Sequence, residues 1–288
     1  MDQRLLSIGH GYTAQALARR LIPEGWHVVG TTRSADKADA IALSGVEPVL
    51  WPGTDLAPLI EEFPNILVSA APGAEGDPVL AALHAQLVEA APHKHWVGYL
   101  STTGVYGDHG GRWVDETTPL TPSTARGKAR VTAEEAWQAI PALPLHIFRL
   151  AGIYGTNRGP FAKVRDGTAR RIVKQDQVFS RIHVDDIATA LELSLHQPDA
   201  GAIYNLCDDD PAPPEDVIAY AAGLLGLPVP PAIPFEEADM TPMARSFYAE
   251  SKRVRNDRIK ADLGWTPQYP DYRTGLNAIL STIERGEV

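Results

Sequence analysis

The fold is decided by one stretch near the start of the chain, Arg4-Leu5-Leu6-Ser7-Ile8-Gly9-His10-Gly11-Tyr12-Thr13-Ala14. A short apolar run ends in Gly-x-Gly-x-x-Ala, and an amphipathic helical pattern follows it. This order of strand, tight turn and helix is the context in which the motif indicates a dinucleotide site. Gly9 permits the turn, Gly11 leaves room for a pyrophosphate, and Ala14 lets the helix pack close to the strand. We therefore expect the start of this helix, with Tyr12 in its first turn, to bind the phosphates of a dinucleotide.

Basic and hydroxylated residues follow the second predicted strand, which runs from Trp26 toward Ser34. In NAD-selective folds, an acidic residue roughly 20 positions after the glycines binds the ribose diol. This chain has Thr32 and Arg33 at the strand exit, and the first carboxylate after the strand is Asp36. Because a guanidinium and hydroxyls suit a 2′-phosphate, Thr32 and Arg33 favour NADP over NAD as the cofactor. The alternative is that Arg33 is a solvated loop charge and that NAD binds.

Strand and helix patterns alternate along the first two thirds of the chain. Apolar runs occupy residues 46–50, 66–72, 96–100, 145–155 and 202–206, and helical patterns occupy residues 55–63, 78–91, 125–139 and 187–195. Such alternation is typical of a parallel sheet with helices on both faces. The sequence therefore predicts an α/β protein with a Rossmann-type, doubly wound parallel sheet.

The last third of the chain is punctuated by prolines, with helical patterns near residues 215–225, 252–263 and 271–285. We interpret it as a smaller C-terminal subdomain on the substrate side. The expected division places the NAD(P)-binding domain at residues 1–158 and most of the subdomain at 159–288, with residues 182–206 returning to the Rossmann core.

Two strand exits carry residues suited to a ligand site, because open parallel sheets bind ligands at the carboxyl ends of their strands. The small residues Ala70, Ala71 and Pro72 let the backbone lie against a cofactor, unless they form a plain turn. Ser101 is expected beside the cofactor. Thr102 either orients a substrate carbonyl or hydroxyl group or satisfies the backbone of the loop.

Bulk properties narrow the classes of partner. The chain has 288 residues, a formal net charge of −10 and 44% hydrophobic residues, which argues against nucleic acid and anionic membranes as partners. The lone Cys207 excludes an internal disulfide and suits the cytoplasm. The chain enters its first strand almost at once, so we expect no signal peptide, and no apolar run approaches the ~20 residues of a membrane span. His93-Lys94-His95 reads as a solvated turn, and no metal site is expected.

Four segments together resemble the extended branch of the short-chain dehydrogenase/reductase superfamily, which contains sugar-nucleotide epimerases and dehydratases. They are Gly9-x-Gly11-x-x-Ala14, Ser101-Thr102 through Val105-Tyr106-Gly107, Arg149 through Ile153-Tyr154-Gly155, and Ile182-His183-Val184-Asp185-Asp186. They follow the family's order across most of the chain. The resemblance implies a nicotinamide cofactor, a small-molecule substrate and a monomer or homodimer.

The chain departs from this family at the catalytic helix. The family places a Tyr-x-x-x-Lys motif there, in which the Tyr exchanges a proton with the substrate and the Lys lowers the Tyr pKa. The register set by Gly127 and Glu134 puts Arg126 at the Tyr position and Arg130 at the Lys position. A guanidinium does not deprotonate, so Arg126 cannot act as the acid. The chain therefore resembles the atypical members that lack the tyrosine.

Other residues are candidates for the missing roles. Tyr106 is the nearest phenol in sequence, and it either replaces the acid or packs against its surroundings. Arg181 and His183 either bind an anionic substrate or pair with neighbouring aspartates. Before Ile182 the extended branch usually has Arg-Asp-Phe, whereas this chain has Phe179-Ser180-Arg181, and this departure argues against a sugar-nucleotide substrate.

Two functions follow from these patterns. In the first, the protein is an NAD(P)-dependent oxidoreductase or an epimerase/dehydratase-like enzyme acting on a small anionic or sugar-like substrate. Its hydroxyl-rich strand exit around Thr102 favours this function. In the second, it is an NADP-binding sensor or scaffold with little catalysis, which the Arg126 and Arg130 substitutions favour.

Overall fold

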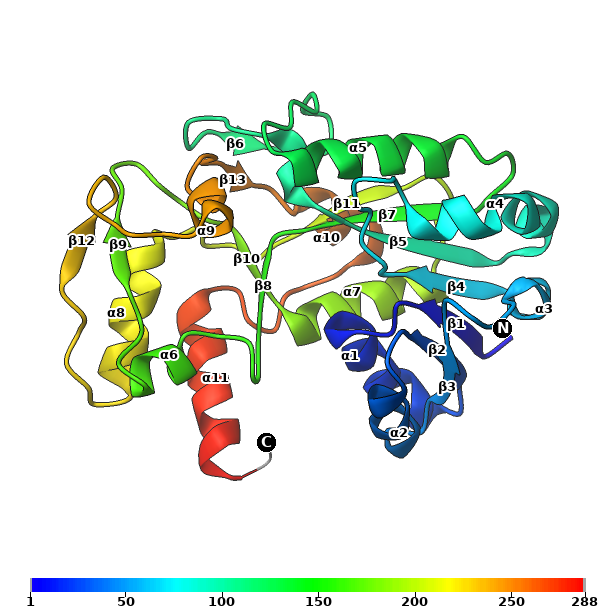
Figure 1. Cartoon of the computed structure of the whole chain (residues 1–288), viewed down its shortest axis with the longest axis horizontal. Helices are drawn as coiled ribbons and strands as arrows, with labels where there is room; N and C mark the ends of the chain where they lie inside the picture. Colours follow the sequence, from blue (N-terminus) through cyan, green and yellow to red (C-terminus); the bar gives the residue numbers. More distant parts are fainter. Residues whose placement is uncertain (1, 287–288) are drawn as a thin grey trace.

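The centre of the molecule is a seven-stranded parallel sheet, seen in the computed structural model, which describes residues 2–286 (Figure 1). Its strand order is β11-β7-β5-β4-β1-β2-β3, so the chain starts in the middle and winds outward to both edges. The strands are β1 (Arg4–Ile8), β2 (His27–Thr32), β3 (Glu47–Leu50), β4 (Asn65–Val68), β5 (Trp96–Thr102), β7 (Leu145–Leu150) and β11 (Ile203–Leu206). The predicted fold class is confirmed.

Helices cover both faces of this sheet because apolar side chains of its strands point alternately to either side. In β1, Leu5 belongs to one buried cluster, whereas Leu6 and Ile8 belong to another. The first cluster packs against α1 (Tyr12–Leu21), α2 (Ala35–Leu43) and α7 (Val184–His196). The second packs against α3 (Ala57–Glu62), α4 (Pro78–Ala90) and α5 (Ala125–Gln138). Figure 1 shows α4 and α5 on the opposite side of the sheet from α1 and α7.

The remaining elements gather mostly beyond the carboxyl ends of the strands. They include three parallel pairs of short strands, namely β8 (Gly152–Tyr154) with β10 (Arg181–His183), β9 (Arg171–Val173) with β12 (Ala232–Pro234), and β6 (Trp113–Val114) with β13 (Arg253–Val254). The helices are α6 (Phe161–Arg165), α8 (Pro214–Leu224), α9 (Pro242–Phe247), α10 (Asp257–Leu263) and α11 (Tyr272–Glu284). Three 3₁₀ turns complete the description, η1 (Ile22–Glu24), η2 (Ala91–His93) and η3 (Thr103–Tyr106).

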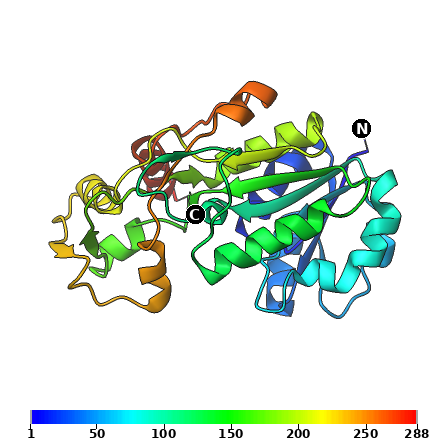
Figure 2. The same cartoon turned by 90° about the horizontal axis from the view of Figure 1, so that it is seen from above.

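A separate apolar cluster holds part of this region together. Tyr154, Phe161, Ala221 and Leu276 are among its members, and they come from β8, α6, α8 and α11. Figure 2 shows α8 (yellow) and α9 (light orange) at the end of the molecule away from the N-terminus. Strand β11 lies at the edge of the central sheet, beside β7. The division into an NAD(P)-binding domain over 1–158 and a substrate-side subdomain that begins at residue 159 stays a prediction.

The predicted helix over 252–263 is shorter in the structure. Arg253 and Val254 form β13 instead, in parallel pairing with β6. The helix begins only at Asp257. Within residues 2–286, no helix has the length and apolar character needed to cross a membrane.

Candidate functional site

A large cleft runs along the carboxyl ends of β1, β4, β5 and β7. Its volume is about 1170 Å³, which is large enough for a dinucleotide and a small second ligand. The elements around it contribute Gly9, Gly11 and Tyr12 from the first turn, Ala71 after β4, Ser101 and Thr102 from β5, Arg126 and Arg130 from α5, and Arg181 from β10. The structure thus brings these predicted residues together in one cavity.

The glycine turn has the geometry that the motif predicts. Gly9 has φ +84°, and a Cβ there would lie 2.8 Å from the backbone nitrogen of Ala70, so glycine is required. The turn is fixed by two hydrogen bonds, in which the Gly9 amide donates to Thr31 Oγ1 and the Ser69 hydroxyl donates to the Gly9 carbonyl. By contrast, a Cβ on Gly11 would meet nothing closer than 3.8 Å. The space beside Gly11 is open to the cleft.

Other predicted cofactor residues lie around this turn without lining the cleft. Ala14 is buried between α1 and the sheet, as its small size predicts. Thr32 is half-buried, and its hydroxyl oxygen accepts a hydrogen bond from the Ser34 amide. Arg33 is exposed and makes no ion pair among the described residues 2–286. Pro72 is half-buried in the turn that follows β4.

The two hydroxyls at the end of β5 have opposite hydrogen-bonding roles. Thr102 Oγ1 accepts from the Gly104 amide at 3.1 Å, so its hydroxyl hydrogen stays available to donate toward the cleft. The Ser101 hydroxyl donates to Glu134 Oε1 at 2.5 Å, so toward a ligand it can only accept. Thr102 therefore both satisfies the loop backbone and lines the cleft.

A buried polar network lies behind Ser101. Glu134 and Arg149 form an ion pair at 2.8 Å with side chains 1% and 4% exposed. Arg149 also donates to the Tyr106 hydroxyl at 3.0 Å, and that hydroxyl donates to Asn205 Oδ1 at 2.8 Å. The network connects α5, β7, η3 and β11, so it fixes the strand exit on which Ser101 stands.

This network contradicts a catalytic role for Tyr106. The side chain is fully buried and does not line the cleft, and its hydroxyl is committed to Arg149 and Asn205. Burial raises the pKa of Tyr106 to about 12. The phenol can neither reach a substrate nor exchange a proton with it near neutral pH. Tyr106 points inward because η3 turns the chain immediately after β5.

Arg126 and Arg130 lie one helical turn apart on the cleft side of α5. Arg130 donates through Nη1 to the Leu100 carbonyl and, at 3.2 Å, to the Tyr99 hydroxyl. It is therefore fixed against β5 in the wall of the cleft. Arg126 is exposed, and its guanidinium carbon lies 5.5 Å from the ring centroid of Phe247 on α9. Gly127 between them lets α5 approach closely, because a Cβ there would lie 2.7 Å from the Gly104 carbonyl oxygen.

Arg181 lines the cleft from β10, whereas His183 on the same strand does not. His183 is 3% exposed, and its Nδ1 accepts from the Asp185 amide as the N-cap of α7. Its ring lies between Tyr154 and Tyr269, with centroid distances of 5.2 and 4.1 Å, and burial lowers its pKa. The structure thus contradicts a substrate-binding role for His183, which is a capping and packing residue.

Several residues that line the cleft were missed in the sequence. Arg158, Phe247, Glu250 and Lys252 all line it. The Arg158 guanidinium carbon lies 5.6 Å from the ring centroid of Tyr12, whose hydroxyl donates to the Thr156 carbonyl. No local motif marks these positions. Phe247 ends α9, and Glu250 and Lys252 follow that helix, so these three residues reach the site only through tertiary packing.

Basic side chains dominate the charge of the cleft although the whole chain is acidic. Its described lining contains Arg126, Arg130, Arg158, Arg181 and Lys252, against the single carboxylate of Glu250. That carboxylate is already paired with Lys252 at 2.7 Å and accepts from Ser123. A cavity with such lining concentrates anions.

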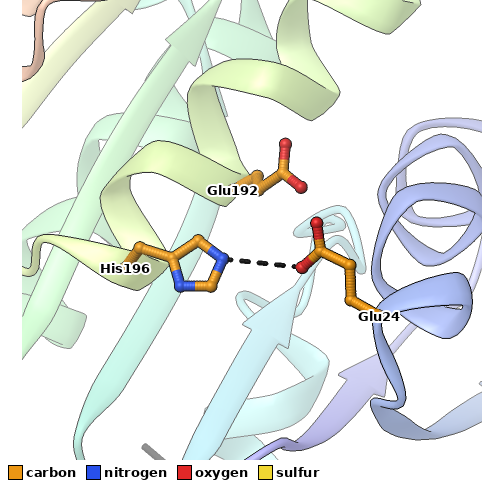
Figure 3. A group of neighbouring side chains, drawn as sticks. All are labelled: Glu24, Glu192 and His196. Carbon is orange, nitrogen blue, oxygen red and sulfur yellow. Dashed lines mark ion pairs between the residues drawn. The ribbon is translucent and has the colours of Figure 1, made fainter.

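Outside the cleft, Glu24, Glu192 and His196 come close together where η1 meets α7 (Figure 3). His196 Nε2 lies 3.8 Å from Glu24 Oε2. Arg20 contacts Glu192 Oε2 at 2.5 Å, so the charge of Glu192 is already balanced. We interpret this group as an ion-pair cluster between the two elements.

Comparisons with known proteins agree with this architecture. Protein YeeZ of Escherichia coli K12 is 29% identical over 286 residues, which cover 93% of this chain and 97% of that protein. A solved structure of a functionally unknown conserved protein from Silicibacter pomeroyi has a TM-score of 0.94 and 60% identity, covering 98% of this chain and 99% of that one. Bacillus anthracis dTDP-glucose 4,6-dehydratase in complex with NAD shares the fold, with a TM-score of 0.76 and 19% identity over 99% of this chain and 97% of that one.

The family match covers most of the sheet and much of the cleft. Residues 8–207 match the NAD dependent epimerase/dehydratase family. This range contains the glycine turn, the Ser101–Thr102 strand exit and the segment from Ile182 to Asp186. These segments are among those that resemble the extended short-chain dehydrogenase/reductases. The chain belongs to the NAD-dependent epimerase/dehydratase family.

Proposed function

We propose that the protein binds a nicotinamide dinucleotide in the cleft, NADP in preference to NAD, and acts as an oxidoreductase or epimerase/dehydratase-type enzyme on a small anionic or sugar-like molecule. One observation carries this proposal. A single cavity joins the open side of Gly11 to the hydroxyls of Ser101 and Thr102. A dinucleotide lying along it would extend from the glycine turn toward these strand ends.

The residues of the first turn fit such a cofactor. The space beside Gly11 accepts a pyrophosphate against the backbone, and α1 presents free N–H groups and its positive dipole end there. Arg158, which lies over the Tyr12 ring, adds a guanidinium near this end of the cleft. The NAD bound in the structure of the Bacillus anthracis relative supports a nicotinamide cofactor here.

When bound, the cofactor supplies hydride transfer chemistry. The Thr102 hydroxyl donates a hydrogen bond to a substrate oxygen, and Ser101 accepts one from a ligand hydroxyl or amide. Arg130, fixed to the Leu100 carbonyl, holds a positive charge in the wall of the cleft. Arg126 also lines the cleft, and in this proposal it contacts an anionic group of the ligand. No tyrosine occurs in the sequence between Tyr106 and Tyr154, so the proton has to come from a group other than a phenol of α5.

The cofactor preference is tested by calorimetric titration of NADPH and NADH into the wild type and Arg33→Ala. NADPH is expected to bind about tenfold more tightly, because one charge-assisted contact to a 2′-phosphate has about that value. Arg33→Ala is expected to remove the difference. Arg165→Ala is the matched control, because this arginine is exposed on α6 and does not line the cleft.

The possible outcomes test the role of Arg33 and the binding of a dinucleotide separately. Equal affinities for the two cofactors in the wild type, or a preference unaffected by Arg33→Ala, would exclude the role of Arg33. Failure of the wild type to bind either dinucleotide would overturn the proposed function itself.

A further inference from the structure

Arg181 enters the cleft close to the hydroxyl-bearing end of β5. Thr102 on β5 pairs with Leu150 on β7, and the chain reaches β8 two residues later. There Gly152 pairs with Arg181 on β10, and both residues line the cleft. Arg181 therefore belongs to the part of the cleft next to Thr102, whereas Arg158 belongs to the part next to Tyr12 and the glycine turn.

One end of the Arg181 guanidinium is already occupied. Its Nη1 donates to the Phe179 carbonyl and to the Ala212 carbonyl, both at 2.9 Å. These two residues form an isolated antiparallel bridge, so the two acceptors are fixed relative to each other. Because a primary guanidinium nitrogen carries two N–H groups, Nη1 is fully used and the side chain cannot rotate freely.

The other edge of the guanidinium is free. Among residues 2–286, nothing accepts a hydrogen bond from Nε or Nη2 of Arg181, and neither atom is among the buried polar atoms that lack partners. These two nitrogens form the planar edge that binds a carboxylate or phosphate through two parallel hydrogen bonds. Their accessible position and their lack of partners leave this edge available to the cleft.

The nearest buried carboxyl does not close this edge. Asp208 is 1% exposed, and both of its side-chain oxygens lack a hydrogen-bond partner in the described part of the chain. The Asp208 amide donates to the Arg181 carbonyl at 2.6 Å. Burial raises the pKa of Asp208 well above its usual range, against the opposing effect of the nearby Arg181 guanidinium, and no guanidinium nitrogen of Arg181 donates a hydrogen bond to either Asp208 oxygen.

We propose that the Nε–Nη2 edge of Arg181 is a preformed receptor for one anionic group, a carboxylate or a phosphate, of the substrate bound next to Thr102. This inference rests on the proposed function and names the substrate class for it. The anion would be fixed by Arg181 while the Thr102 hydroxyl reaches another oxygen of the same molecule. The receptor is separate from the Gly11 end of the cleft, which would hold the phosphates of the proposed cofactor.

The test titrates malonate and, separately, inorganic phosphate into the NADPH-loaded protein by calorimetry, at constant ionic strength maintained with chloride. The wild type is expected to bind at least one of these anions saturably with one site per chain. Arg181→Lys keeps the charge but loses the planar edge, so it is expected to weaken binding by about tenfold or more. Arg165→Lys, the same exchange at an exposed site on α6, is expected to leave binding unchanged.

NADPH affinity, measured in the same series, distinguishes a failure of this inference from a failure of the proposed function. It is expected to change less than twofold in Arg181→Lys, which also shows that the variant is folded. A wild type that binds NADPH but neither anion would overturn this inference and leave the proposed function intact. Anion binding that is equal in the wild type and Arg181→Lys would also overturn it, whereas a wild type that does not bind NADPH would overturn the proposed function.

A crystal structure of the wild type with NADPH and malonate, or with phosphate, tests the geometry without any variant. The inference requires anion oxygens within hydrogen-bond distance of both Nε and Nη2 of Arg181. An anion bound by Arg126 or Lys252 instead would contradict it. Comparing the two anions identifies which source of negative charge the receptor prefers.

Discussion

The Glu134 carboxylate is enclosed by the Ser101 hydroxyl and the Arg149 guanidinium, with almost no contact to solvent. A buried ion pair of this kind contributes little by its mere presence, but removing one partner leaves a charge in a medium that solvates it poorly. The pair is therefore important for keeping the end of β5 in place.

We expect Arg149→Met to lower the free energy of unfolding by about 3–5 kcal/mol, because Glu134 would keep a buried charge without its partner. Urea unfolding measures this loss. The control is Asp257→Asn, which breaks the exposed contact with Arg255 and should cost less than about 1 kcal/mol. Similar losses in both variants would show that the Glu134 pair is not the buried, tightly coupled pair described above.

At the scale of elements, the position of α5 depends on a glycine. A Cβ on Gly127 would lie 2.7 Å from the Gly104 carbonyl oxygen and 2.8 Å from Pro122 Cβ. Helix α5 also carries Arg126 and Arg130, so any displacement of this helix moves two cations of the cleft.

Gly127→Ala is expected to lower the free energy of unfolding by about 1–3 kcal/mol, because the added methyl group has no space. Gly223 on α8 is the matched control, since a Cβ there meets nothing within 4 Å. Gly223→Ala should therefore stabilise the protein by about 0.5–1 kcal/mol through helix propensity. Thermal or urea unfolding of both variants distinguishes the two effects, and stabilisation by Gly127→Ala would contradict the close contact.

The long elements could be predicted from the sequence and the short ones could not. Apolar periodicity predicted β1, α4 and α7 to within a few residues. The pairs β6–β13 and β8–β10 contain only two or three residues per strand, so no periodicity exists to reveal them. Lys94 shows the same limit, because it is 9% exposed and donates to the Phe63 carbonyl at 2.7 Å beyond α3 instead of lying in a solvated turn.

At the scale of the whole molecule, two buried histidines link folding to pH. Burial lowers the pKa of His10 and of His146 to about 4 in each case. The pKa of each histidine is thus lower in the folded than in the unfolded protein, where it is about 6.5. The contribution of such a histidine to the free energy of unfolding is fully present above about pH 6.5 and is lost as the pH falls toward 4. Asp186 acts in the opposite direction, because burial raises its pKa to about 6 and its protonation favours the folded state as the pH falls.

We expect each histidine to lower the free energy of unfolding by about 2 kcal/mol as the pH falls from 7 to 5. His146→Phe keeps the contact with the Trp96 ring, whose centroid lies 5.9 Å away, and removes one titrating group. The difference in unfolding free energy between this variant and the wild type should therefore grow by about 2 kcal/mol from pH 7 to pH 5. A difference that does not change with pH would contradict the neutral state of buried His146.

The candidate site could be predicted only where its residues follow a strand directly. Gly9, Gly11 and Thr102 lie at strand ends, and their positions on the cleft follow from the topology of a parallel sheet. Tyr106 also follows a strand, but η3 turns it into the core, and this turn has no apolar period. Phe247 and Lys252 come from more than a hundred residues later, so only the folded chain shows that they belong to the site.

Calorimetric titration of NADPH into Gly11→Val tests most directly whether a dinucleotide lies along the open side of Gly11. Because a Cβ at Gly11 meets no atom closer than 3.8 Å, the variant should fold with nearly wild-type stability, while its side chain occupies the place of the pyrophosphate. Gly223→Ala serves as the folded control that retains binding. We expect NADPH binding to be lost in a cooperatively folded Gly11→Val protein. Wild-type affinity in that protein would contradict it.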